Sequence, residues 1–147
     1  MKLRIAWIGK TKESAIQLLT DEYLKRLSRC VDVQGTALKD ESALLTLCGP
    51  DARPPKHTLV LLDSRGKQLS SEEFAEFLGN HRDRNPLPLL FAVGPANGFT
   101  AETRKEANLL LSLGKMTVAH ELARVVLLEQ LYRAFTILKG HPYHLGH

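Results

Sequence analysis

Cysteine is scarce in this chain of 147 residues, which contains only Cys30 and Cys48 and no CxxC pair. This spacing argues against a disulfide framework and against the common zinc sites, so we expect two buried free thiols. The start, MKLRIAWIGK, has too short an apolar stretch for a secretion signal and no small-residue cleavage site. We therefore interpret it as a first strand and expect a cytoplasmic protein.

Motifs of several common chemistries are also missing. The loop Gly94–Gly98 (GPANG) is neither a GxGxxG fingerprint nor a GxxxxGK[ST] phosphate loop, so nothing supports a Rossmann dinucleotide site or a P-loop NTPase. No GxSxG elbow occurs, and the histidines never form an HExxH motif. We expect no metal site.

The composition is that of one ordinary globular domain. Hydrophobic residues make up 44% of the chain, enough to bury a core, and we expect residues 1–147 to form a single domain. The formal net charge is +4, and residues 1–39 carry an excess of Lys and Arg. This charge permits an anionic partner and by itself favours nucleic acid over a small molecule only weakly.

Short apolar runs alternate with helical patterns along the chain. The predicted strands are 3–8, 31–37, 58–62, 87–93 and 109–113, and the predicted helices are 13–28, 40–47, 71–82, 100–108 and 121–138. Ser70 or Ser71, followed by Glu72 and Glu73, is predicted to cap the third helix. The alternation predicts an α/β fold with a mostly parallel sheet flanked by helices.

Three loops follow three of the predicted strands. They are Asp63–Lys67 (DSRGK), Gly94–Gly98 and Gly114–Val118 (GKMTV). Ligands of open parallel sheets bind outside the carboxyl ends of the strands, so these loops are the candidate pocket. Their glycines would let the backbone approach a ligand closely, although tight turns alone also explain them.

The segment Glu121–Leu138 is more apolar than a helix with one covered side requires. One side of it is expected to pack on the chain's own sheet, and in so short a chain a second subunit is the simplest cover for the other. We therefore expect a homodimer. Arg124, Glu129 and Arg133 interrupt the apolar run, which argues against a membrane span.

Four segments carry a resemblance to a known family. They are LLDSRGKQLSSEEFA (61–75), VGPANGF (93–99), LSLGKMTVAHELARVVLLEQLYRAF (111–135) and HPYH (141–144). Together with the MKLRI start, they resemble the bacterial ribosomal RNA large subunit methyltransferase H family. The resemblance implies a SPOUT-class enzyme that uses S-adenosylmethionine to methylate N3 of a pseudouridine in 23S rRNA, with the assembled ribosome as the expected substrate. It also implies a homodimer and a C-terminal trefoil knot.

The resemblance also implies a cofactor site. The family's contacts fall on Leu62, Gly94, Leu113, Gly114, Lys115, Met116, Thr117 and Val118 of this sequence. These positions coincide with the three candidate loops, and such a site would hold the adenosine mainly through backbone groups and apolar walls. The Thr117 hydroxyl either contacts the cofactor or caps the following helix.

Pro95 follows Gly94 where the family usually has a second glycine. Proline has no N–H, so the cofactor affinity falls if that amide normally donates to the cofactor. If the amide faces away, Pro95 only stiffens the loop, and we favour this interpretation.

The catalytic candidates are Arg133, Tyr143 and His144. Methyl transfer is an in-line displacement, so the attacking nitrogen must be positioned and must lose its proton. Arg133 either stabilises negative charge on the target base or pairs with Glu129 on its own helix. Tyr143 and His144 either close over the base, to stack on it and accept its proton, or belong to a disordered terminus. His120 is expected to cap or pack, with proton transfer as the alternative.

A basic surface must also hold the phosphates of an RNA substrate. Candidates are Lys10, Lys12, Lys25, Arg26 and Arg29, although a solvated helix face explains each of them singly.

Two other functions are compatible with the sequence. One is a non-catalytic ribosome-binding protein that keeps the fold, and cofactor binding would separate it from an enzyme. The other is a related SPOUT methyltransferase that modifies the ribose of a tRNA, which the DSRGK and PYH motifs disfavour and which the position of the methyl group would reveal.

Overall fold

The computed structural model describes residues 1–146, and for His144 the backbone alone. The strands are β1 (Lys2–Ile8), β2 (Asp32–Leu38), β3 (Thr58–Gln68), β4 (Leu89–Val93) and β5 (Leu109–Ser112). The helices are α1 (Ser14–Ser28), α2 (Glu41–Cys48), α3 (Ser71–Arg84), α4 (Ala101–Lys105), α5 (His120–Lys139) and the short 3-10 helix η1 (Pro142–Gly146). The predicted order of strands and helices is confirmed.

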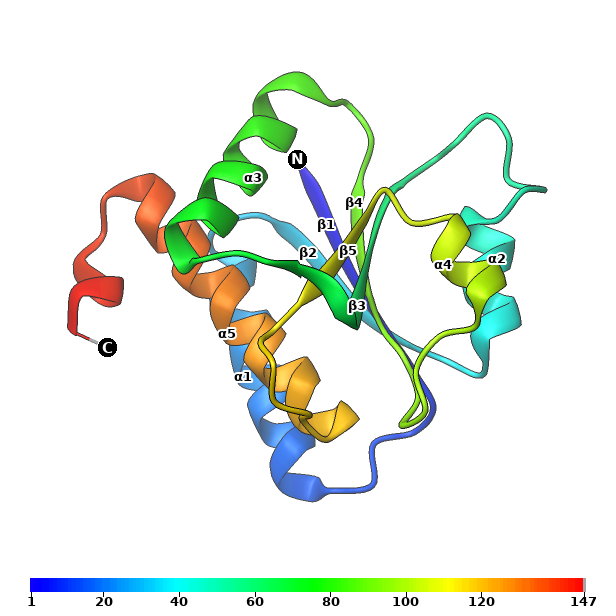
Figure 1. Cartoon of the computed structure of the whole chain (residues 1–147). Coiled ribbons are helices and arrows are strands. Elements are labelled where there is room, and N and C mark those ends of the chain that lie inside the picture. Colours follow the sequence, from blue (N-terminus) through cyan, green and yellow to red (C-terminus); the bar gives the residue numbers. More distant parts are fainter. Residues whose placement is uncertain (147) are drawn as a thin grey trace.

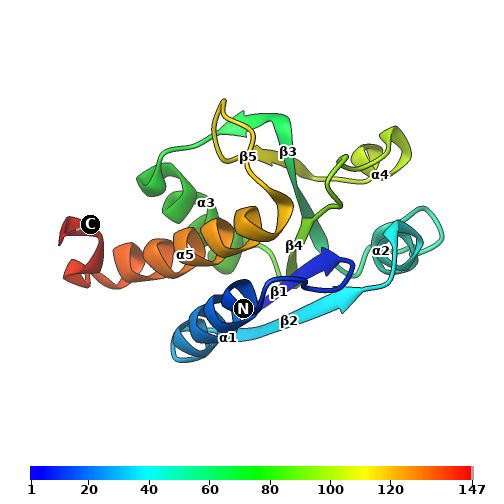
Figure 2. The ribbon, with the colours of Figure 1, turned by 90° about the horizontal axis from the view of Figure 1, so that it is seen from below.

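The strands form one five-stranded sheet in the order β2-β1-β4-β3-β5, and every neighbouring pair is parallel. Helices α1, α3 and α5 cover one face of the sheet, and α2 and α4 cover the other (Figures 1 and 2). The predicted α/β fold with a parallel sheet flanked by helices is therefore confirmed.

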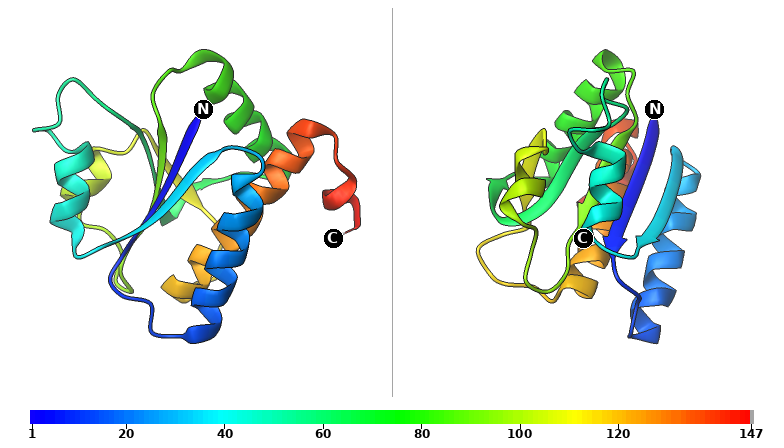
Figure 3. Two further views of the ribbon diagram at one scale, coloured as in Figure 1. Left: turned by 180° about the vertical axis from the view of Figure 1, so that it is seen from behind. Right: turned by 90° about the vertical axis from the view of Figure 1, so that its right-hand side faces the viewer.

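Alternation along the central strands supplies a core on each face. In β4, Leu89 and Phe91 belong to the cluster under α1, α3 and α5, whereas Leu90 and Ala92 belong to the cluster under α2 and α4. All five residues of β4 are buried, as expected for a central parallel strand covered on both faces. The two helical layers on either side of the sheet are visible edge-on in Figure 3.

Helix α5 is covered on both flanks by its own chain. It packs against α1 on one side and α3 on the other, and Leu127, Leu128 and Leu131 on its inner face have no exposed surface. Covering α5 therefore does not by itself require a second subunit, because two helices of the same chain do so. Of its large apolar side chains, Leu122 near the start remains 47% exposed.

Local signals fix the ends of the helices. Ser70 accepts a hydrogen bond from the Glu73 N–H, and the Glu73 carboxylate accepts one from the Ser70 N–H, so the predicted cap of α3 is a complete capping box. Gly140 ends α5 in the left-handed conformation, at φ +71°.

Strand β3 differs from the prediction, which placed a loop at Asp63–Lys67. The strand continues to Gln68, and its pairing with β5 shifts register between Leu62 and Lys67. The residues between those two form a bulge. Gly66 permits it, because a Cβ at this position would lie 2.5 Å from the backbone carbon and oxygen of Leu110.

Among the described residues, no helix is long and apolar enough to cross a bilayer. Cys30 and Cys48 are both free, and both are only partly buried, which corrects the expectation of fully buried thiols.

We expect Gly66→Ala to destabilise the protein by roughly 3 kcal/mol, because the new methyl group meets backbone that cannot move aside without breaking the β3–β5 pairing. Gly140→Ala is the control, since a Cβ there meets no atom within 4 Å and only the left-handed backbone is penalised. That penalty is about 1 kcal/mol. Urea unfolding of both variants gives the comparison, and equal losses would contradict the close approach of Gly66 to Leu110.

Candidate functional site

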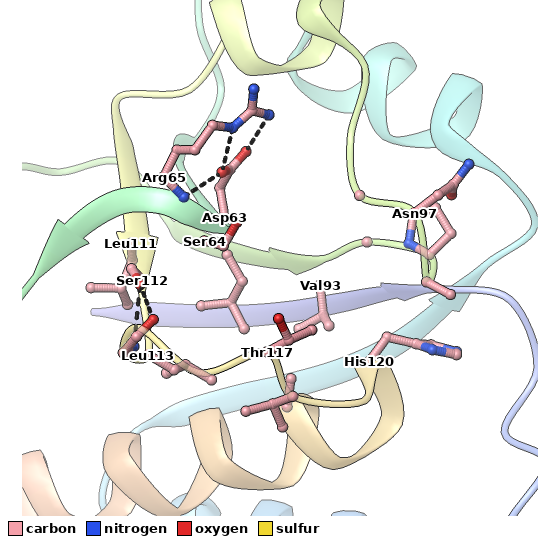
Figure 4. Close-up of a pocket in the computed structure, with 18 of the residues that line it drawn as sticks. Asp63, Ser64, Arg65, Val93, Asn97, Leu111, Ser112, Leu113, Thr117 and His120 are labelled. Carbon is pink, nitrogen blue, oxygen red and sulfur yellow. Dashed lines mark hydrogen bonds and ion pairs between the residues drawn. The ribbon is translucent and has the colours of Figure 1, made fainter.

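A cavity of about 360 Å³ lies where the carboxyl ends of β3, β4 and β5 meet (Figure 4). These strands are neighbours in a parallel sheet, so the segments that follow them emerge at one edge. The lining comes from residues 62–65 at the bulge within β3, from 93–98 at the end of β4 and after it, from 111–114 and 116–118 at the end of β5 and after it, and from His120 and Ala123 of α5. The three segments that the sequence predicted as a pocket do line one cavity.

Nearly all the predicted cofactor positions lie in this lining. They are Leu62, Gly94, Leu113, Gly114, Met116, Thr117 and Val118. Lys115 does not line the cavity. The alternative role of Thr117 as a helix cap is wrong, because Ala119 is the N-cap of α5 and no side chain caps it. In Figure 4 Thr117 lies between the loops, facing the cavity.

The loop after β5 is held in shape by one hydroxyl. Ser112 Oγ donates to the Gly114 carbonyl over 2.9 Å and accepts from the Gly114 N–H over 3.1 Å. Gly114 has a φ of +145°, which a residue with a side chain rarely adopts. This arrangement leaves the backbone of the loop formed before any ligand arrives.

The loop after β4 is a turn closed by Pro95. The Pro95 carbonyl accepts from the Gly98 N–H over 2.8 Å, and Gly98 has a φ of +80°. Proline retains the carbonyl that this turn needs, so Pro95 is compatible with the loop. Gly94 lies against Phe99, whose ring would be 3.0 Å from a Cβ at position 94.

An ionised carboxylate stands at one end of the cavity. Asp63 accepts from the Arg65 N–H over 2.8 Å and from the Arg65 Nε over 3.3 Å, and Arg104 Nε lies 4.0 Å away. Burial alone would raise the pKa of Asp63. The hydrogen bonds from Arg65 and the charges of Arg65 and Arg104 outweigh that effect, so the pKa lies below its ordinary value. This polar end contrasts with the apolar walls formed by Leu62, Val93 and other residues.

Helix α5 contributes two lining residues through its first turn. His120 begins the helix and lines the cavity instead of capping, and Ala123 lines it one turn later. Sequence reasoning missed Ala123, because a small apolar residue in an apolar helix carries no signal that separates a pocket wall from a core contact.

The catalytic candidates lie at the opposite end of α5. That helix has 20 residues, which corresponds to a length of about 30 Å. Arg133 pairs with Glu129 through Nη2 and Oε1 at 2.7 Å, so the predicted alternative of a same-helix pair is confirmed. Within one chain the structure does not bring Arg133 to the cavity.

Tyr143 is docked on the same end of α5. Its ring packs edge-on against Tyr132 with 4.9 Å between centroids, and the Arg133 guanidinium lies 5.2 Å from the Tyr143 centroid. Burial, followed by the charge of Glu129, raises the pKa of Tyr143 to about 12, so its hydroxyl stays protonated near neutral pH. The side chain of His144 lies outside the described residues.

No group of three or more His, Cys, Asp or Glu side chains that could hold a metal ion occurs within residues 1–146.

Comparison with known proteins gives matches over almost the whole chain. Residues 1–144 match the family described as "Predicted SPOUT methyltransferase". The ribosomal RNA large subunit methyltransferase H of Koribacter versatilis is 62% identical over 147 residues, which cover 100% of both chains. The protein of the same name from Trichlorobacter lovleyi is 43% identical, over 98% of this chain and 99% of its own.

Two solved structures share the fold. A probable methylase family protein from Haemophilus influenzae Rd KW20 matches with a TM-score of 0.58 and 12% identity, over 96% of this chain and 69% of its own. The methyltransferase candidate Lpg2936 from Legionella pneumophila, solved with the bound cofactor SAM, matches with a TM-score of 0.51 and 14% identity. This second match covers 91% of the present chain and 66% of the other.

At such low identity the two structures support the fold alone, whereas the family match and the 62% identity extend over nearly every residue that builds the cavity. The chain belongs to the SPOUT methyltransferase family, and within it to the ribosomal RNA large subunit methyltransferase H family.

Proposed function

We propose that this protein transfers a methyl group from S-adenosylmethionine to N3 of a pseudouridine in the 23S rRNA of the large ribosomal subunit, in the cytoplasm. The observation that carries the proposal is the cavity formed by the bulge of β3 and the loops after β4 and β5, in a chain 62% identical to a ribosomal RNA large subunit methyltransferase H. SPOUT methyltransferases use S-adenosylmethionine, and one structural neighbour contains it. The choice of pseudouridine N3 rests on the four sequence segments given above.

The residues of the cavity fit the cofactor. Its volume of about 360 Å³ suits a small ligand, and a nucleoside would lie against the apolar walls of Leu62 and Val118 and the backbone of Gly94 and Leu113. The Gly114 loop is already shaped by Ser112, so little order has to be gained on binding. When bound, S-adenosylmethionine supplies an electrophilic methyl group on a sulfonium.

We propose further that the enzyme is a homodimer whose tail acts on the partner's cavity. The helical rise places Arg133 about 20 Å along α5 from His120 at the cavity, and Tyr143 lies beyond the end of the same helix. Exposed apolar side chains line the cavity, among them Met116 at 83% and Leu113 at 37%. Such a patch suits a protein contact, and a second copy would cover it while bringing its own tail to the methyl donor.

In the composite site Arg133, Tyr143 and His144 of one chain each have a separate role at the cavity of the partner. The Arg133 guanidinium stabilises negative charge on the carbonyl oxygens of the base as N3 loses its proton. Tyr143 stacks and donates a hydrogen bond, since its raised pKa of about 12 makes its phenol a poor proton acceptor. His144 accepts the N3 proton, because an imidazole exchanges protons near neutral pH.

The trefoil knot belongs to the same proposal. Edge strand β5 is followed by α5, which packs between α1 and α3 instead of beside β5 (Figures 1 and 2). The connecting residues 113–119 therefore cross back past the carboxyl ends of β3 and β4. This return is where the C-terminal segment would thread through a loop. Family membership supports the knot.

The proposed reaction has a direct test. Purified protein is titrated calorimetrically with S-adenosylmethionine and then incubated with the cofactor and 70S ribosomes that lack the modification. We expect cofactor binding and new N3-methylpseudouridine in the digested 23S rRNA, detected by mass spectrometry. Absence of binding would support a non-catalytic ribosome-binding protein, and a methyl group on ribose would show that the assigned target is wrong.

We expect Gly94→Val to weaken cofactor binding more than tenfold, because the added side chain meets the buried Phe99 ring and must displace the β4 loop that lines the cavity. Pro95→Ala is the matched control in the same turn: it keeps the carbonyl that closes the turn, so its Kd should stay within about twofold of wild type. Calorimetry gives both values. Normal binding by Gly94→Val would remove the β4 loop from the site.

We expect deletion of residues 141–147 to abolish methyl transfer while cofactor binding and dimerisation persist, and Tyr143→Phe to lower the rate without affecting either. Because the tail is proposed to act in trans, mixing the deletion variant with Gly94→Val should restore activity. If the chains exchange at random, about half of the dimers contain one chain of each variant. Only one of the two sites in such a dimer is complete, so we expect about a quarter of the wild-type rate. No recovery in a confirmed mixture, judged by sedimentation of tagged chains, would contradict the composite site.

A further inference from the structure

The loop Gly9–Glu13, between β1 and α1, is fastened to the first turn of α5. Helix α1 has no side-chain cap of its own. Instead the Glu121 carboxylate accepts from the Lys12 N–H over 3.1 Å and from the Glu13 N–H over 3.3 Å. The hydrogen bond from Lys12 is the main reason why the pKa of Glu121 lies below its ordinary value. A residue far along the chain thus holds the backbone that leads into α1, at the N-cap Glu13 and at Lys12 before it.

Arg124 fastens the same loop from one turn further along α5. It is only 2% exposed, and its Nη1 donates to Thr11 Oγ1 over 2.8 Å and to Thr20 Oγ1 over 3.4 Å. Its guanidinium lies 4.3 Å from the centroid of the Trp7 ring. Within the described part of the chain, no carboxylate hydrogen-bonds to this buried cation, which is costly to bury even with the charge of Glu121 nearby. Its hydrogen bonds instead connect α5 to the loop at Thr11 and to α1 at Thr20.

The loop lies beside the cavity. Its anchor Glu121 is the neighbour in sequence of His120, which lines the cavity together with Ala123. Strand β1 pairs with β4 up to Trp7 opposite Val93, so the loop after β1 emerges next to the loop after β4. Both lie at the lower edge of the sheet in Figure 1, close to the start of α5.

Two lysines stand on this loop, together with the carboxylates of Glu13 and Glu121. Lys10 and Lys12 are exposed, and neither forms an ion pair within the described part of the chain. Arg26, a basic candidate on α1, is by contrast paired with Glu22 at 3.0 Å. It also lies in the last turn of α1, whose 15 residues place it about 18 Å or more from the loop.

We propose that Lys10 and Lys12 bind phosphate groups of the RNA that flank the target nucleotide, and that Glu121 is the positioning residue that presents them. This rests on the proposed function, since it assigns the surface that holds the substrate while the base enters the cavity. A phosphate contact fixes the position of the RNA without reading its sequence. Because the backbone of the loop is already ordered, only the two lysine side chains lose conformational freedom when their ammonium groups bind.

The test compares two double variants on 70S ribosomes that lack the modification. Lys10→Ala/Lys12→Ala should raise the KM for ribosomes about tenfold and make the salt dependence of log KM less steep by about 1.5, in keeping with two lost phosphate contacts. The kcat and the Kd for S-adenosylmethionine should stay as in wild type. The control is the double variant Lys56→Ala/Lys105→Ala. It removes the same charge near the amino end of β3, where both residues line a separate cavity, and should leave the KM unchanged.

Glu121→Gln tests the positioning role. The amide is a weaker acceptor for two N–H groups, so hydrogen exchange at the Lys12 and Glu13 amides should accelerate and the KM for ribosomes should rise severalfold, again with kcat retained. Faster exchange with an unchanged KM would overturn the role of Glu121.

The outcomes separate this inference from the function on which it rests. Wild-type protein that leaves ribosomes unmethylated would refute the proposed function itself. Methylation by wild type, with the same KM and salt slope for Lys10→Ala/Lys12→Ala, would overturn the phosphate surface alone. A raised KM with an unchanged salt slope would show contact with something other than phosphate, such as a ribosomal protein, and would overturn it as well.

Discussion

Parallel pairing of β4, β3 and β5 as adjacent strands is the constraint on which the site depends. Parallel strands send their carboxyl ends to one edge, so three segments far apart in sequence meet there and enclose one cavity. The register is held by burial on both faces, since a slip of one residue in β4 would exchange the two core clusters. A ligand recognised mainly by backbone needs this rigidity, because backbone groups are only as well placed as the strands behind them.

Different parts of helix α5 make different contacts. Its first turn supplies His120 to the cavity and Glu121 to the β1–α1 loop, its middle packs in the core, and its last turns carry Arg133 against Glu129. A straight helix cannot bring its two ends together. The proposal that the cavity holds the methyl donor and that Arg133 and Tyr143 act on the base therefore requires the proposed second copy. The sequence suggests a dimer for a different reason, namely that the apolar surface of α5 needs a second subunit to cover it. In the structure α1 and α3 of the same chain already cover that surface, so the proposed dimer rests instead on the distance along α5.

Much of this arrangement could be predicted from the sequence, because periodicity reports burial directly. The continuous apolar run of β4 predicts a strand buried on both faces. The start of α3 is predicted by a different signal, the capping box at Ser70. The extent of β3 could not be predicted, since DSRGK has the composition of a turn and its bulge depends on Gly66 meeting the backbone of Leu110. The hydrogen bonds from the Lys12 and Glu13 N–H groups to Glu121 could not be predicted either, because a long-range hydrogen bond to backbone N–H groups leaves no pattern in either segment.

The first turn of α5 connects two surfaces that would otherwise be independent. His120 and Ala123 form a wall of the cavity, while Glu121 and Arg124, one turn apart at the start of the same helix, hold the loop that carries Lys10 and Lys12. Any displacement of this turn therefore moves the wall of the cavity and the lysines together. A cofactor that packs against His120 and Ala123 would steady the loop as well, and a substrate bound by the loop would steady the wall. The buried guanidinium of Arg124 makes this connection stiff, since leaving Thr11 would strand a cation among apolar neighbours.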